Sequence, residues 1–356
     1  MENSRQKFDL MVFSLLDSHT TTSHFTNIRI DNYVYTREAL TQARKLLKPD
    51  GLFVVKFQVD TPWIAGRLFE LLQTTFGQSP IQFQTELGGF DSSGRFFVAG
   101  SPERLVKATA DPALSAYLAE HGNMPMQQAT LTTDDWPYFY QHAPGLPIIV
   151  LTVSMAVLIV FGWFLRQTSD KGAGIDLHFM FLGAGFMLLE AQIVSKMALL
   201  FGTTWVVNAV VVSGLLCLIV AANLVYGAIP RIPLAVAYLG LFVSLAVMYV
   251  VPLEKLFYAS WTLRALMAML ALCTPVFFAG IIFISSFERA GFRGSALGSN
   301  LLGALLGGLL ESLSMWFGLK SLTILAALLY LASAIFLNRA TANKVEEHAR
   351  DVAVPA

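Results

Sequence analysis

The sequence predicts a membrane protein in two parts, an all-α bundle of about seven transmembrane helices preceded by a partial α/β domain. Hydrophobic residues make up 55% of the 356-residue chain and charged residues only 13%, where a soluble domain has about a quarter charged. Apolar runs about as long as a bilayer is thick recur between Leu146 and Leu337. The preceding residues are polar and rich in turn signals, as in a soluble domain.

The net charge and the positions of the cysteines argue against nucleic-acid binding, a disulfide and a metal site. Lysine and arginine balance aspartate and glutamate at a net charge of zero, so no basic surface for nucleic acid is expected. Cys217 and Cys273 both lie inside apolar runs, where thiols act as small hydrophobic side chains. We therefore expect neither a disulfide nor a metal site.

Residues 1–100 alternate between strand and helix signals. The expected elements, in order, are a strand at Phe8–Leu16, a helix over Tyr33–Leu47 stopped by Lys48–Gly51, a strand at Leu52–Phe57, a helix at Pro62–Phe76 and two closing strands at Ile81–Thr85 and Arg95–Ala99. The helix at Pro62 begins with proline and is followed by Gly77, as helices commonly are. This order predicts α/β organisation with a largely parallel sheet.

Four stretches resemble the second half of spermidine synthases and of their class I methyltransferase relatives. They are Phe8-Asp-Leu-Met-Val, Leu16-Asp-Ser-His, Tyr35-Thr-Arg-Glu-Ala-Leu and Leu46-Leu-Lys-Pro-Asp-Gly-Leu-Phe-Val. The resemblance implies a Rossmann-like half-domain, a catalytic Asp17 at a strand end, a substrate-binding Tyr35 and an amine substrate such as a polyamine. The alternative is that Asp17 only caps the segment that follows it.

The resemblance also implies S-adenosylmethionine or its decarboxylated form as the cofactor, but the glycine-rich turn that holds such a nucleotide is missing. Gly183-Ala-Gly185 lies in an apolar span, and Gly88-Gly89 links two late strands. We therefore expect no cofactor to bind this chain alone. The sequence is interpreted as the C-terminal part of a longer protein, or as one with a misplaced start.

Residues 101–145 are a linker with an expected helix at Pro102–His121. The segment Thr132-Thr-Asp-Asp-Trp-Pro-Tyr-Phe-Tyr140 resembles one in membrane-fused spermidine synthase-like proteins, which implies substrate-facing roles for Asp134 and Asp135. Aromatic residues just before a transmembrane segment also fit a belt at the membrane interface, formed here by Trp136, Tyr138 and Tyr140.

The transmembrane domain is expected over residues 146–338, before a polar tail at 339–356. Its apolar runs are Leu146–Leu165, Leu177–Leu200, Val206–Tyr226, Pro233–Val251, Leu263–Phe287, Gly298–Phe317 and Ser321–Leu337. The last run is short and the sixth is glycine-rich, so six spans are the alternative. The stretches Phe181–Glu190 and Gly298–Gly308 resemble helices of the same fused proteins, which implies a major-facilitator-like bundle.

Five polar residues lie within these runs, where ionisable groups are costly and mark a pathway or a buried pair. They are Glu190, Lys196, Asn208, Asn300 and Glu311. Asn300, Gly303, Gly307 and Glu311 share one helix face, and the glycines there predict a closely packed neighbouring helix. Both a transport role and a structural bridge remain open for the charged residues.

Loop charge predicts the orientation in a bacterial inner membrane. Eight basic residues in alternate loops and the tail, against three on the opposite side, predict a cytoplasmic C-terminal tail. Seven spans would then put residues 1–145 outside, although an enzyme that uses an adenosyl cofactor is expected in the cytoplasm.

Two functions follow from these observations. The first is a transferase of the aminopropyl or methyl class, inactive as this chain alone. The second is a transporter-like or scaffold protein of the lipid bilayer that uses its soluble remnant as a docking surface.

Overall fold

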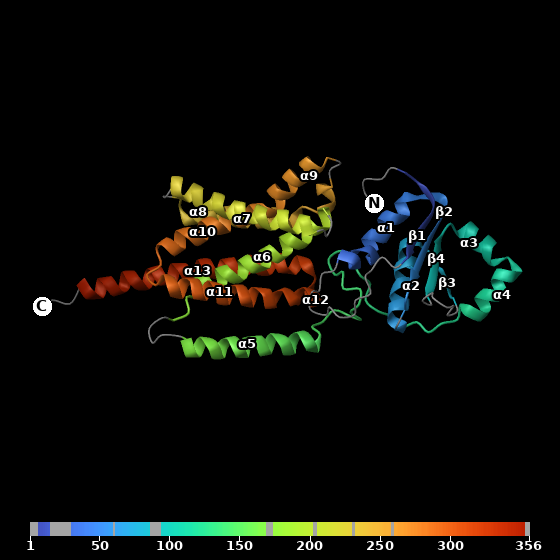
Figure 1. Cartoon of the computed structure of the whole chain (residues 1–356), viewed down its shortest axis with the longest axis horizontal. Coiled ribbons are helices and arrows are strands. Elements are labelled where there is room, and N and C mark those ends of the chain that lie inside the picture. Colours follow the sequence, from blue (N-terminus) through green and yellow to red (C-terminus); the bar gives the residue numbers. More distant parts are fainter. Residues whose placement is uncertain are drawn as a thin grey trace. The chain divides into compact units, whose positions relative to one another are not determined.

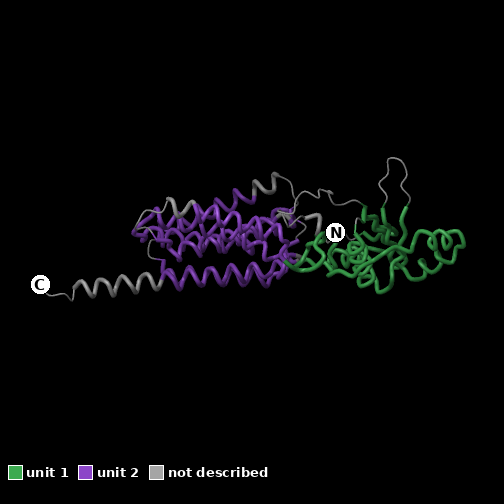
Figure 2. The backbone as a smooth tube through the Cα atoms, turned by 90° about the horizontal axis from the view of Figure 1, so that it is seen from below, with its two compact units in different colours: residues 1–145 green, residues 146–356 purple. Residues whose placement is uncertain are grey.

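The computed structural model describes residues 6–14, 30–59, 61–85, 94–168, 174–201, 205–229, 232–257 and 260–352. The chain divides into two compact units, residues 1–145 and residues 146–356, shown in different colours in Figure 2. Strands occur only in the first of these units among the described residues, and apolar helices of spanning length only in the second.

The first unit contains a four-stranded mixed sheet with the strand order β1-β2-β4-β3 (Figure 1). Its strands are β1 (Phe8–Ser14), β2 (Leu47–Phe57), β3 (Ile81–Gln84) and β4 (Arg95–Gly100). Only β1 and β2 pair in parallel, whereas β4 is antiparallel to both β2 and β3. The expectation of a largely parallel sheet was therefore wrong. The connection between β3 and β4 is too short for the crossover that parallel neighbours need.

In the described part of the first unit, five helical segments accompany the sheet. They are η1 (Ile30–Tyr35), α1 (Arg37–Leu46), α2 (Pro62–Phe76), α3 (Pro102–Thr109) and α4 (Pro112–His121). The helix expected over Pro102–His121 is divided in two, because Asp111 caps a new helix whose first residue is Pro112. The residues Lys48–Gly51, expected to follow a helix as a turn, instead belong to β2.

The two faces of the sheet differ in burial. Phe53, Val55 and Phe97 on one face are fully buried, in a core shared with α1 and α2. On the opposite face, the β1 side chains Leu10 and Val12 are 55% and 53% exposed. An apolar face of this kind in a sheet with parallel strands is normally covered by another layer.

The second unit is a bundle of apolar helices (Figure 1). Its elements are α5 (Ile148–Thr168), α6 (Leu177–Phe201), α7 (Trp205–Ala228), α8 (Leu234–Val250), η2 (Leu253–Leu256), α9 (Trp261–Ala268), η3 (Met269–Cys273), α10 (Thr274–Glu288), α11 (Arg293–Leu310), η4 (Glu311–Leu313), α12 (Ser314–Phe317) and α13 (Leu319–Val352). Among the described residues, five helices are long and apolar enough to cross a membrane, and two further apolar helices are shorter. A helical membrane bundle therefore agrees with the structure.

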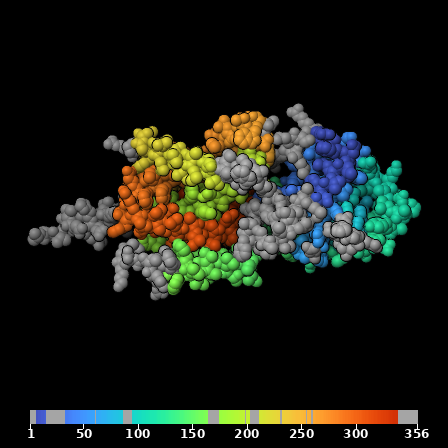
Figure 3. All heavy atoms as spheres, in the orientation of Figure 1, coloured from blue at the N-terminus to red at the C-terminus, as the bar shows by residue number. Residues whose placement is uncertain are grey.

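Exposed apolar side chains cover much of this unit's surface. On α5, which forms one border of the bundle in Figure 3, Ile148, Ile159 and Trp163 are all at least 60% exposed. The segment η3 is a π-helical turn immediately before Thr274 and Pro275. Pro275 has no backbone N–H, so it cannot donate the hydrogen bond that a regular α-helix would form at this position.

Helices α6 and α11 approach each other closely through glycine. A Cβ atom added at Gly303 would overlap the carbonyl oxygen of Met180, and one added at Gly307 would overlap that of Ala184. The side-chain amide of Asn300 donates a hydrogen bond of 3.2 Å to the carbonyl oxygen of Phe179. The close neighbouring helix expected from the glycine spacing is thus present, and it is α6.

Candidate functional site

The candidate site of the first unit lies at the carboxyl end of β2. The Tyr35 ring is buried against Phe57, the last residue of β2, with 5.2 Å between ring centroids, and against Phe139 at 4.9 Å. Ligands of open α/β sheets bind outside the carboxyl ends of the parallel strands. Asp17, the catalytic residue expected from the sequence, lies outside the described residues.

Thr36, just before α1, links this helix to the segment that contains Asp134. Its hydroxyl oxygen accepts a hydrogen bond from the backbone amide of Ala39, as an N-cap residue does. The hydroxyl proton has two acceptors in reach, Asp134 Oδ1 at 2.6 Å and the carbonyl oxygen of Tyr33 at 3.1 Å. The shorter contact to a charged oxygen is the stronger one, so the hydroxyl donates to Asp134.

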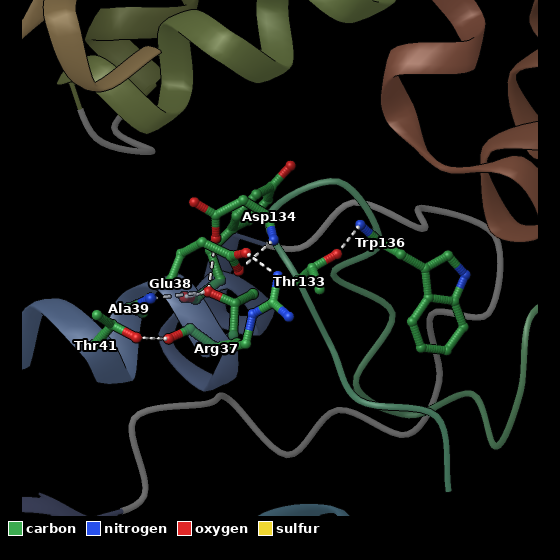
Figure 4. A network of polar contacts seen from close by, with 9 residues as sticks. Arg37, Glu38, Ala39, Thr41, Thr133, Asp134 and Trp136 are labelled. Atoms are coloured by element: carbon green, nitrogen blue, oxygen red, sulfur yellow. Dashed lines mark hydrogen bonds and ion pairs between the residues drawn. The ribbon is translucent and has the colours of Figure 1, made fainter. Parts of the chain in front are cut away.

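Three further hydrogen bonds hold residues 132–134 against the same turn. Thr132 Oγ1 donates to the carbonyl oxygen of Tyr35 at 2.5 Å, and the Arg37 amide donates to the Thr132 carbonyl oxygen at 3.0 Å. The Asp134 amide donates to Glu38 Oε2 at 3.0 Å (Figure 4). Two carboxylates, those of Glu38 and Asp134, are therefore held near the N-terminus of α1, where the helix dipole favours negative charge.

Aromatic hydroxyl groups and a third carboxylate surround this pair. Burial raises the pKa of the Tyr33 hydroxyl well above its usual range, and the nearby Tyr138, Asp134 and Asp135 raise it further. Because a neighbouring negative charge disfavours phenolate, Tyr33 stays neutral and can donate a hydrogen bond at physiological pH. Asp134 is exposed and Asp135 half-buried, so solvent reaches the acidic side of the site.

Arg67 on α2 fixes the remainder of this segment. Its guanidinium is fully buried and donates to the carbonyl oxygens of Thr130 at 2.7 Å, Gln141 at 2.7 Å and His142 at 2.9 Å. It also donates to the carbonyl oxygens of Tyr138 and Phe139. One side chain thus fastens both ends of the segment that carries Asp134 and Asp135.

Aromatic rings complete the surroundings of the Arg67 guanidinium. It lies 5.0 Å from the centre of the Trp63 ring and 5.5 Å from that of Trp136, within the range of cation–π attraction. Burial lowers the pKa of Arg67 to about 10, so the side chain remains charged at neutral pH.

The interpretation of Trp136, Tyr138 and Tyr140 as an interfacial belt does not hold for the first two. Trp136 is 7% exposed and Tyr138 is 3% exposed, because the Trp136 ring packs against the Arg67 guanidinium and against the Tyr138 ring. Only Tyr140, 46% exposed, is accessible among the three.

The polar residues expected in the membrane part do not gather into one described cluster. Lys196 Nζ donates to the carbonyl oxygen of Met248 at 3.4 Å, and Asn300 bonds α6 as given above. Glu190 is half-buried in α6, and Glu311 is half-buried at the start of η4. Asn208 lies on α7, but its side chain is outside the described part of the chain.

Sequence reasoning named Tyr35, Asp134 and Asp135 as substrate-binding residues but did not identify Thr36, Glu38 or Arg67, which hold their segments in place. Thr36 could have been found as a threonine directly before a helical pattern. Nothing in the residue spacing marks Arg67, because its acceptors are backbone carbonyl oxygens. Comparisons with protein-family models, curated proteins and solved structures gave no match for this chain.

Proposed function

We propose that residues 1–145 form a spermidine synthase-like half-domain that binds a cationic amine at Asp134, Asp135 and Glu38, and that a membrane-spanning helical bundle follows it in the sequence. The proposal places the protein in the aminopropyl- or methyl-transferase class by ancestry. The chain alone binds the amine but does not carry out the transfer.

The carboxylates held at the N-terminus of α1 carry this proposal. An ammonium group has three donors and no acceptor, so it needs several carboxylate, hydroxyl or carbonyl oxygens around it. Asp134 offers an exposed carboxylate oriented by Thr36, and its backbone amide fixes Glu38 beside it. Neighbouring Tyr33 and Tyr138 add aromatic faces, which attract cations.

The sheet supports the same proposal. Its parallel pair β1–β2 is followed by the antiparallel strands β4 and β3, which agrees with the closing pair expected from the sequence. The exposed Leu10 and Val12 on β1 leave an apolar face of the sheet for a further layer. β1 is also an edge strand of the described sheet, and a strand of a complementary α/β half would pair at this edge.

Among the residues that the structure describes, no glycine-rich turn fits an adenosyl cofactor. The close pair Gly183 and Gly185 lies in α6 against Asn300 and Tyr330, and not in a strand–turn–helix connection. We therefore derive no transfer step. S-adenosylmethionine or its decarboxylated form would be held by a complementary half-domain, with Asp134 facing the acceptor amine.

Replacing Asp134 by asparagine is expected to weaken binding of 1,4-diaminobutane to the full chain about 10- to 100-fold. A hydrogen bond to a charged group contributes about 1.5–3 kcal/mol, and asparagine keeps the shape while removing the charge. Isothermal titration calorimetry on the chain in nanodiscs measures the change.

The matched control is Glu103→Gln, which removes an exposed carboxylate from α3. It should leave the affinity unchanged. Equal affinity in wild type and Asp134→Asn, or equal losses in both variants, would contradict an amine site at Asp134.

The membrane part is proposed to cross a bacterial inner membrane seven times, with the tail 339–356 in the cytoplasm and residues 1–145 on the other side. The alternation of basic loops supports this orientation. With Cys217 and Cys273 replaced by alanine, an impermeant thiol reagent added outside intact cells should label Lys107→Cys and not Ala342→Cys. Labelling of both or of neither would eliminate the seven-span arrangement.

A further inference from the structure

A chain of polar side chains is buried between three helices of the 146–356 unit. His178 on α6 is 3% exposed and Ser333 on α13 is fully buried. His178 Nδ1 lies 2.9 Å from both the carbonyl oxygen and the hydroxyl oxygen of Ser333. The Tyr238 hydroxyl on α8 lies 3.1 Å from the same Ser333 hydroxyl, so the chain runs from α6 through α13 to α8.

The geometry at Nδ1 identifies which nitrogen of His178 is basic. The Ser333 carbonyl oxygen can only accept, so Nδ1 carries a proton and donates to it. In the neutral imidazole Nε2 is then left with its lone pair. A proton added to Nε2 would leave the Nδ1 hydrogen bond to Ser333 in place.

Two atoms of this region are buried without a hydrogen-bond partner in the described structure, His178 Nε2 and the Tyr330 hydroxyl. Tyr330 is fully buried and lies one helical turn from Ser333 on the same face of α13. Its ring lies so close to α6 that a Cβ added at Gly185 would be 3.0 Å from it. Buried polar groups are almost always satisfied, so such atoms indicate a bound polar species.

We propose that His178 is a proton-binding site of the helical bundle, with Nε2 as the atom that takes the proton, and that it is connected through Ser333 to Tyr238. In the binding step a hydronium ion gives its proton to Nε2. An N–H bond forms, an O–H bond breaks, a water molecule remains and the imidazole gains the positive charge. Ser333 keeps the ring oriented throughout, because its carbonyl oxygen accepts from Nδ1 in both protonation states.

The charged and titratable groups nearest to His178 favour a positive charge on its imidazole ring. Asp176, two residues before His178, accepts hydrogen bonds from the His178 and Phe179 amides, at 3.0 and 3.3 Å, and its negative charge stabilises an imidazolium. On α8, Tyr238 reaches the site through the Ser333 hydroxyl, whereas the Tyr330 ring on α13 lies against Gly185, seven residues along α6 from His178. On α10, Glu288 accepts a 2.7 Å hydrogen bond from Tyr226 of α7, and α11 begins with Arg293.

Nitrogen-15 NMR of the full chain in nanodiscs, with histidine labelled, tests the proposal directly. The His178 signals are identified by their shift in Ser333→Ala, which keeps the backbone carbonyl. We expect the chemical shift of His178 Nε2 to change from that of an unprotonated to that of a protonated ring nitrogen as the pH falls from about 8 to 5. Asp176→Asn, which retains the helix cap, should move the midpoint to lower pH by about 0.5–1 unit.

The proposal is overturned if the His178 signal stays that of a neutral imidazole over the whole pH range. It is also overturned if Asp176→Asn leaves the midpoint unchanged. The readout is confined to the 146–356 unit and is therefore independent of amine binding at Asp134.

Discussion

Replacing Arg67 by methionine is expected to lower the free energy of unfolding of the first unit by about 3–5 kcal/mol, the usual cost of removing one partner of a buried charged interaction. Methionine fills similar volume but leaves the carbonyl oxygens of residues 130–142 without their donor. Urea unfolding of the full chain, followed by tryptophan fluorescence, measures the loss. Trp63 and Trp136 flank the guanidinium and report on it.

Arg104→Met is the matched control. Arg104 donates one hydrogen bond of 2.9 Å from an exposed position on α3, to the carbonyl oxygen of Asp50. Its loss should change the unfolding free energy by no more than about 0.5 kcal/mol. If Arg67→Met were as mild as this control, Arg67 would not be the residue that fastens the Asp134 segment.

Replacing Gly303 by alanine is expected to destabilise the helical bundle by about 3 kcal/mol, at the upper end of the cost of overpacking. The added methyl group would overlap the carbonyl oxygen of Met180, and backbone atoms cannot move aside as a flexible side chain can. Helices α6 and α11 must then separate, with loss of the Asn300 hydrogen bond to α6. The thermal midpoint of the chain in detergent measures the effect.

Gly298→Ala on the same helix provides the comparison. A Cβ at Gly298 meets no atom within 4 Å, so the substitution should leave the midpoint nearly unchanged. Equal midpoints for the two variants would mean that α6 and α11 do not approach each other closely at Gly303.

The parts of the fold that the sequence predicted are those with local signals. Pro62 and Gly77 bound α2 where expected, and Gly77 takes the left-handed conformation with φ of 78° that its position after a helix requires. The mixed sheet was missed because strand direction depends on which strands become neighbours. β4 lies between β2 and β3, and no local pattern specifies that order.

In the candidate sites, too, single residues could be predicted from the sequence, but their contacts with distant residues could not. The family resemblance pointed to Tyr35 and Asp134, but the hydrogen bond between Thr36 and Asp134 joins residues 98 positions apart. His178 and Ser333 are 155 positions apart, and each by itself resembles an ordinary polar residue in an apolar helix. Their pairing depends on how α6 and α13 pack, which periodicity does not specify.

The measurement that tests the central claim most directly is covalent mapping of a diamine on the full chain. A photoreactive derivative of 1,4-diaminobutane, with excess unmodified diamine as competitor, would be followed by peptide mass spectrometry. We expect competitor-sensitive labelling in the peptides that contain Tyr33–Glu38 and Thr133–Tyr140, because these segments meet at the Asp134 carboxylate. Competitor-sensitive labelling restricted to residues 146–338, or labelling that the competitor does not reduce, would contradict an amine site in the first unit.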